Sequence, residues 1–105
     1  MNKYGSRLTI YNGVKYHSKL EAKHAQRLDL LIKAKEVIKY ERQFKIKLQV
    51  KDSHICNYLI DFKVYLTNGN IEYHEVKGFE TALWKLKYKL TKAIYPDYNL
   101  VLIKK

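Results

Sequence analysis

Two acidic residues and one lysine lie on neighbouring segments of the sequence that have the pattern of β-strands. Asp61 interrupts the apolar run Leu59–Leu66, whereas Glu75 and Lys77 stand at the end of the run Ile71–Lys77. Two carboxylates can hold a divalent cation, and an ammonium group beside them can orient a water molecule or neutralise charge on a phosphate. These residue types predict a magnesium-dependent reaction at a phosphodiester.

The turn between the two strands decides whether the three side chains share a face. Glu75 and Lys77 are two residues apart, so they share a face in any register. An Asn-Gly turn of two residues would pair Asp61 with Val76 and point the aspartate to the other side. A three-residue turn over 68–70 pairs Asp61 with Lys77 and places it diagonal to Glu75. We expect this longer turn, although Asn-Gly alone favours the shorter one.

Four groups are candidate ligands for Mg²⁺, for which Mn²⁺ would substitute. We expect carboxylates from Asp61 and Glu75, and the backbone carbonyl of Val76 could add a ligand between them. Glu21 is the fourth candidate, because it begins the apolar face of a predicted helix that packs on the sheet. Glu21 also has the capping-box spacing from Ser18, a role that satisfies backbone donors and is compatible with ligation.

Two lysines are candidates for contact with the reacting phosphate. Lys77 could deprotonate the attacking water or stabilise developing charge, and the sequence leaves both roles open. Lys87 lies on the sheet-facing side of the second predicted helix and is expected to reach the scissile phosphate. The other lysines of that helix, and those at 45, 47 and 51, fit a solvated surface as well as a patch that follows a DNA backbone.

The overall charge favours a polyanionic partner. The 105-residue chain has 21 Lys and Arg against 10 Asp and Glu, which gives a net charge of +11 at pH 7. Such a surface attracts nucleic acid in a salt-dependent manner. No apolar run is long enough to span a membrane, so a membrane is not expected as a partner. The single cysteine, Cys56, allows no internal disulfide and fits a reducing cytoplasm.

The order of predicted elements is that of one α/β domain over residues 1–105. The expected elements are a hairpin of Arg7–Tyr11 and Val14–Tyr16, a helix from Ser18 to about Lys35, strands Phe44–Val50, Asn57–Leu66 and Ile71–Lys77, a helix capped by Thr81, and a strand Asn99–Ile103. The second helix should bury a stripe of Leu83, Leu86, Leu90, Ala93 and Ile94. Because the last strand returns after a helix, it should pair in parallel within a mixed sheet.

At the acidic residues and the lysine the chain resembles the PD-(D/E)xK nuclease superfamily. In that pattern Asp61 matches the first acid, Glu75 the second acid and Lys77 the lysine. Glu21 matches the acid on the first helix. One departure is Ile60, which replaces the named proline.

Longer segments carry a narrower resemblance. The segments Y-N-G-V-K-Y-H-S-K-L-E-A-K, E-R-Q-F, E-V-K-G and L-K-Y-K-L look like small phage- and prophage-encoded nucleases that are related to Holliday-junction resolvases. The resemblance implies a restriction-endonuclease-like mixed β-sheet flanked by helices. It also implies accessory roles at the site for Gln43 and Lys87.

These observations predict a divalent-metal-dependent DNA endonuclease that acts in phage recombination, repair or DNA processing, in the host cytoplasm. Because 105 residues leave no room for a separate sequence-reading domain, branched DNA is a candidate substrate. Symmetric cleavage of a junction would call for a homodimer. Two alternatives stay open: a basic nucleic-acid-binding module in which the acids are structural, and a ribonuclease of the same fold.

Overall fold

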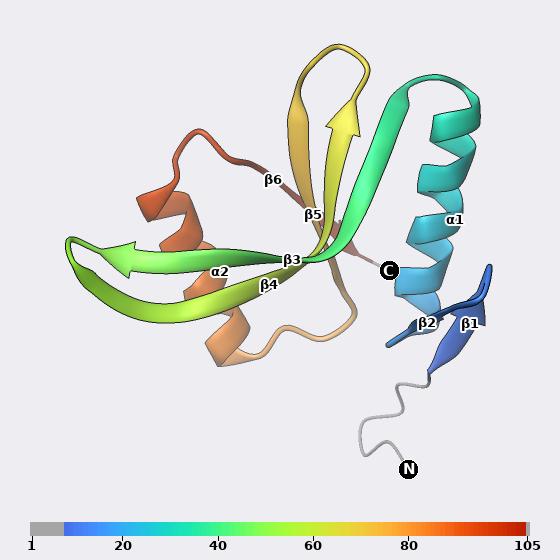
Figure 1. Cartoon of the computed structure of the whole chain (residues 1–105). Helices are drawn as coiled ribbons and strands as arrows, with labels where there is room; N and C mark the ends of the chain where they lie inside the picture. Colours follow the sequence, from blue (N-terminus) through green and yellow to red (C-terminus); the bar gives the residue numbers. More distant parts are fainter. Residues whose placement is uncertain (1–7, 105) are drawn as a thin grey trace.

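The computed structural model describes residues 8–104, which form a two-stranded hairpin, two helices and a four-stranded sheet (Figure 1). The hairpin consists of β1 (Thr9–Tyr11) and β2 (Val14–Tyr16). The remaining elements are α1 (Lys19–Lys33), β3 (Val37–Val50), β4 (Ser53–Leu66), β5 (Ile71–Lys77), α2 (Ala82–Ile94) and β6 (Asn99–Lys104). Arg7, the expected start of the first strand, lies outside the described residues. Within 8–104, neither helix has the length and apolar character needed to cross a membrane.

The strands of the sheet follow the order β3-β4-β5-β6. Strand β4 is antiparallel to both of its neighbours, whereas β6 returns through α2 and pairs with β5 in parallel. The mixed sheet and the order of elements confirm the predicted α/β architecture. Strands β3 and β4 are longer than expected, because their pairing runs from Val37 opposite Leu66 to Val50 opposite Ser53.

The loop between β4 and β5 has three residues, as expected, but covers 67–69 instead of 68–70. The Leu66 N–H donates to the Asn70 carbonyl at 2.9 Å and closes the loop. Gly69 takes the third position with φ +92°, a left-handed conformation that three-residue hairpin loops require there. The need for glycine at that position explains why the loop starts one residue early.

This loop corrects the predicted register of β4 against β5. The ladder pairs Phe62 with His74, and its next step places Asp61 opposite Glu75. The predicted partner of Asp61, Lys77, is therefore wrong by two residues. An error of two residues preserves the face of a strand, so Asp61, Glu75 and Lys77 remain on the same side.

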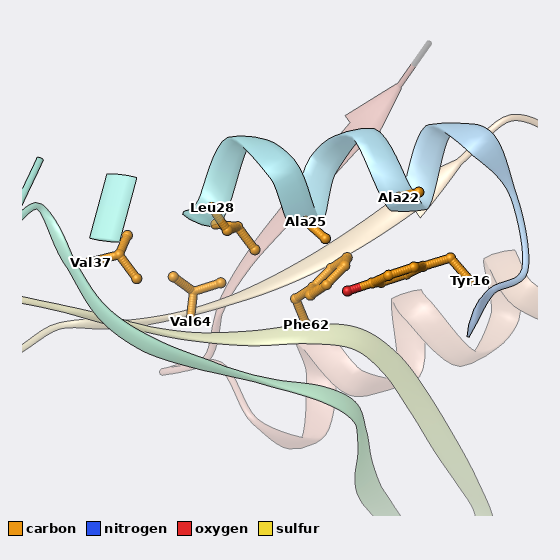
Figure 2. Packing of buried hydrophobic residues seen from close by; sticks show 7 residues of the cluster. All are labelled: Tyr16, Ala22, Ala25, Leu28, Val37, Phe62 and Val64. Carbon is orange, nitrogen blue, oxygen red and sulfur yellow. The ribbon is translucent and has the colours of Figure 1, made fainter. Parts of the chain in front are cut away.

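Helix α1 packs on one part of the sheet and begins as the capping pattern predicts. The Ser18 side chain accepts a hydrogen bond from the Glu21 backbone N–H at 3.1 Å. The apolar face of the helix then lies against β3 and β4 (Figure 2). The buried cluster consists of Tyr16, Ala22, Ala25, Leu28, Val37, Phe62 and Val64.

Helix α2 covers a second cluster but uses a different face from the one predicted. Leu83 and Leu86, which begin the predicted stripe, are exposed, whereas Trp84 is buried. The positions of α2 that are buried or half-buried include Trp84, Tyr88, Leu90, Thr91 and Ile94. The aromatic rings bury more area than leucines, and the polar atom of Trp84 finds hydrogen-bond partners inside, so the helix is rotated toward them.

Near Asp61, the two long strands pass from the cluster beneath α1 to the cluster beneath α2. Phe62 packs in the cluster beneath α1, whereas Ile60, two residues earlier, packs in the cluster beneath α2. Alternate residues of a regular strand share one face, so β4 twists sharply between them. Gln43 lies opposite in β3 and has φ +51°, and Figure 1 shows both strands bending in this region.

Candidate active site

A pocket of about 360 Å³ lies between β4, β5 and the first turns of α2. Its lining consists of Asn57, Tyr58, Leu59, Asp61, Glu75, Lys77, Thr81, Leu83, Trp84 and Lys87. Four of the five residues predicted for catalysis are among them: Asp61, Glu75, Lys77 and Lys87. The bend in β4 and the crossover through α2 thus bring together four predicted residues that are spread over 61–87 in the sequence.

The Asp61 carboxylate is held from two sides. Its Oδ2 atom accepts a hydrogen bond from the Val76 backbone N–H at 2.8 Å. Its Oδ1 atom lies 3.4 Å from the side-chain nitrogen of Gln43. The Val76 N–H thus orients the acid.

The Glu75 carboxylate lies at the floor of the pocket and is 3% exposed. Its Oε2 atom accepts a hydrogen bond from the Tyr58 hydroxyl and a second, of 2.7 Å, from the Trp84 indole N–H. Both donors engage the same oxygen, which leaves Oε1 outside these two bonds. The side chain is therefore fixed by the α2 cluster, and its carboxyl group also contacts that of Asp61.

No described basic side chain compensates ionisation of the carboxyl groups at the floor. Burial, and next contact with Asp61, raise the pKa of Glu75 to about 8, although the donors from Tyr58 and Trp84 act in the opposite direction. Among residues 8–104, no Lys or Arg forms an ion pair with Asp61 or Glu75. A cation beside the two carboxylates would remove this penalty.

The two predicted lysines face the pocket from different elements. The Lys77 ammonium lies 5.2 Å from the centre of the Trp84 ring, so Trp84 contacts both Lys77 and Glu75. The Lys87 ammonium donates to the Asn57 backbone carbonyl at 3.1 Å, across the pocket from α2 to β4. These contacts hold both positive charges close to the acids without pairing with them.

Glu21 is linked to the site through Gln43. Its Oε1 atom lies 3.5 Å from the Gln43 side-chain nitrogen and 3.6 Å from the Arg42 guanidinium. The same Gln43 nitrogen also faces Asp61, so it bridges the two acids. Burial first, and then Asp61, raises the pKa of Glu21, whereas His17 and Arg42 lower it. Glu21 therefore stands beside the site, not in the pocket lining.

The donor set fits a hard dication that keeps part of its water shell. Within the described residues, no three His, Cys, Asp or Glu side chains are arranged to hold a metal ion. Magnesium needs fewer protein ligands, because it usually takes one or two carboxylates together with water and phosphate. Half-buried Asp61 and buried Glu75 offer two adjacent carboxyl groups of this kind. Ligation by Val76 and Glu21 stays a prediction.

Comparison with known proteins gives a family but no named activity. A family model described as "Protein of unknown function (DUF1064)" matches residues 1–105. The chain belongs to the DUF1064 family. No curated protein and no solved structure matches it.

In this DUF1064 chain, Trp84 and Tyr58 are site residues that the sequence pattern did not identify. Both donate to Glu75, and Trp84 also contacts Lys77. Their positions in the sequence were the available signal. Tyr58 shares a strand face with Ile60, and Trp84 lies in the first turn of the helix that Thr81 caps. Large aromatic residues with a polar atom need a buried partner, and the neighbouring acid supplies it.

Proposed function

We propose that this chain is a divalent-metal-dependent DNA endonuclease of the PD-(D/E)xK type. The observation that supports the proposal is the convergence of Asp61, Glu75 and Lys77 on one pocket, with two carboxylates that no described basic side chain neutralises. The resemblance of the sequence to that superfamily and the mixed sheet between two helices support it further.

The protein groups have separable tasks in such a reaction. Asp61 and Glu75 hold the cation, which when bound supplies a positive charge for the phosphate and an activated water. Val76 and Gln43 fix Asp61, while Tyr58 fixes Glu75. These contacts keep the carboxylates in place before substrate arrives, which avoids reorganisation during the reaction.

The lysines act on the substrate. Lys77 is held beside the acids by the Trp84 ring, where its ammonium can stabilise charge that develops on the phosphate or orient water. Lys87 lies on the opposite wall of the pocket and can contact a neighbouring phosphate oxygen. The net charge of +11 attracts the polyanion over a longer range.

Cleavage of labelled DNA tests the proposal. Wild-type protein is incubated with duplex, single-stranded and junction DNA in Mg²⁺, in Mn²⁺ and in EDTA. Cleavage should require the metal and should fall by roughly a thousandfold or more in Asp61→Asn and Lys77→Ala. Asp97→Asn and Lys33→Ala, which change exposed residues outside the pocket lining, serve as matched controls and should retain activity.

Other results would redirect or reject the proposal. Metal-dependent cutting of RNA alone would assign a ribonuclease of the same design. Tight DNA binding with no cleavage in either metal would identify a binding module, and the two acids would then be structural. Equal cleavage by Asp61→Asn and wild type would reject the pocket as the active site.

A further inference from the structure

The mouth of the pocket carries aliphatic side chains that the fold leaves in solvent. Leu59 on β4 and Leu83 on α2 both line the pocket, yet they are 52% and 63% exposed. The floor is different, because Tyr58, Glu75 and Trp84 line the same pocket and are at most 7% exposed. We call Leu59 and Leu83 the apolar lip.

Two further large apolar side chains near Leu83 in sequence are exposed. Leu86 follows Leu83 by three residues on the same side of α2 and is 62% exposed. Phe79, in the connection from β5 to α2, is 78% exposed. Large side chains exposed together in this way usually mark a binding surface, because leaving them in water is unfavourable.

The charges around the lip decide what covers it. Lys77 and Lys87 line the same pocket, and Lys85 and Lys89 are exposed on α2. A second copy of the chain related by a two-fold axis through this face would bring the lysines of both copies together. A partner that carries negative charge and apolar faces at once has the complementary chemistry. A nucleotide has both, because its phosphate is anionic and its base has an exposed π-face.

The mixture of leucines and lysines favours an unpaired nucleotide over an intact duplex. In an intact duplex the base faces are stacked, so a leucine side chain meets only sugars, phosphates and the edges of bases. Apolar side chains such as Leu and Phe contact bases where a step is unstacked or a nucleotide is turned out of the helix. The pocket volume of about 360 Å³ is near the lower end for small-ligand sites, which suits a single nucleotide.

We propose that the apolar lip binds an unpaired nucleotide next to the scissile phosphate, so that the protein prefers DNA with a gap, flap or branch over intact duplex. The inference rests on the proposed function, since it places the substrate phosphate among Asp61, Glu75 and Lys77. Leu59 and Leu83 are specificity residues in this scheme. They contact the base and take no part in the chemistry.

Binding in EDTA tests the lip without any cleavage. The probes are a duplex and the same duplex with a four-nucleotide gap, each containing 2-aminopurine at the centre, at one fixed salt concentration. Wild type should bind the gapped DNA roughly tenfold more tightly and change the fluorescence of its unpaired base. Leu83→Ser and Leu59→Ser should lose most of this preference and keep their affinity for intact duplex.

Leu30→Ser is the matched control, because Leu30 on α1 is also 63% exposed and does not line the pocket. It should behave as wild type.

Equal affinity of wild type for gapped and intact DNA, or equal loss of both affinities in the lip variants, would overturn the proposal. A wild-type dimer that dissociates in Leu83→Ser, seen by sedimentation, would assign the lip to a second copy instead. A protein that never cuts DNA but keeps the gap preference would reject the nuclease and retain the lip as a base-binding surface.

Discussion

Two neighbouring residues of β5 are buried, titratable and turned to opposite sides of the sheet. Glu75 faces the pocket beneath α2, where it meets Asp61. His74 faces α1, where its Nδ1 atom lies 2.8 Å from His24 Nε2 and its Nε2 atom lies 2.9 Å from Glu72. In both places burial is the largest cause of a shift toward the neutral form. It raises the pKa of Glu75 to about 8 and lowers that of His24 to about 4.

The two sites differ in whether neighbouring side chains supply the hydrogen-bond or charge partners that their titratable groups need. When Glu72 accepts a hydrogen bond from His74 Nε2–H, the His74 Nδ1 atom accepts one from His24 Nε2–H. Both N–H protons of the two imidazole rings then have an acceptor. Protonation of His24 would place a hydrogen on its buried Nδ1, which has no hydrogen-bond partner. Every N–H of the neutral histidine pair therefore has an acceptor, and only the lone pair of His24 Nδ1 is left without a partner. The carboxyl pair has no such internal solution for its ionised form, which an outside cation would stabilise.

A buried residue with a shifted pKa is not by itself a functional site. His24 packs edge-on against Phe62 in the α1 cluster and is enclosed by helix and sheet. Glu75 is equally buried but lines a pocket that also contains two lysines. Access for a ligand, together with charge that the fold leaves uncompensated, separates a candidate site from a structural hydrogen bond.

The largest expected effect is on stability, from the histidine pair. His24→Ala leaves a cavity against Phe62 and removes the partner of His74, so the free energy of unfolding should fall by about 2–4 kcal/mol. DNA cleavage per folded molecule should stay unchanged. Urea unfolding measures the loss, with exposed His54→Ala as the control that should change little. A selective loss of cleavage with intact stability would place the histidines in the active site.

The next effect concerns Glu75, which makes the free energy of unfolding fall as pH rises. Native Glu75 holds its proton up to about pH 8, whereas the unfolded chain loses it near the ordinary value of 4.5. Between these values the native state binds more protons, so the free energy of unfolding falls as pH rises. Glu75→Gln, which mimics the protonated acid, should raise it by about 1–2 kcal/mol at pH 8.5 and by little at pH 4.5.

The histidine pair has the opposite dependence and provides the internal comparison. Native His24 stays neutral down to about pH 4, whereas the unfolded chain takes up a proton near 6.5. Its contribution is present above pH 6.5 and is lost as pH falls toward 4. Thermal unfolding of wild type, Glu75→Gln and exposed Glu36→Gln across this range measures both. If Glu75→Gln leaves the alkaline limb of the profile unchanged, burial does not shift Glu75 as described.

The local elements and the shared face could be predicted from sequence, because both depend on short-range rules. The Ser18 cap starts α1, and the period of two keeps Asp61 and Glu75 on one side even with the register wrong by two residues. The rotation of α2 toward Trp84 depends on which rings the sheet can bury, and that is a tertiary property. Leu83 therefore reads as core in the sequence and is exposed in the fold.

The bend of the long strands was equally beyond local rules. A glutamine within a run of alternating residues gives no signal for a left-handed backbone, yet Gln43 has φ +51° at the point where β4 changes sides at Asp61. The histidine pair was missed because its members are 50 residues apart, and only the packed helix brings them together. Such contacts arise from topology and not from periodicity.

The smallest expected effect on stability comes from two residues with a left-handed backbone, of which only Gln43 contacts the site. Gln43, at the bend of β3, has φ +51°, and Lys51, in the turn between β3 and β4, has φ +54°. This region costs roughly 1 kcal/mol for residues other than glycine. Glycine adopts it freely, so Gln43→Gly and Lys51→Gly should each stabilise the fold by up to about 1 kcal/mol in urea unfolding. Only Gln43→Gly removes the nitrogen that bridges Glu21 and Asp61, so its cleavage rate should fall roughly tenfold while that of Lys51→Gly holds. Equal rates in the two variants would show that the bend, and not the amide of Gln43, positions the acids.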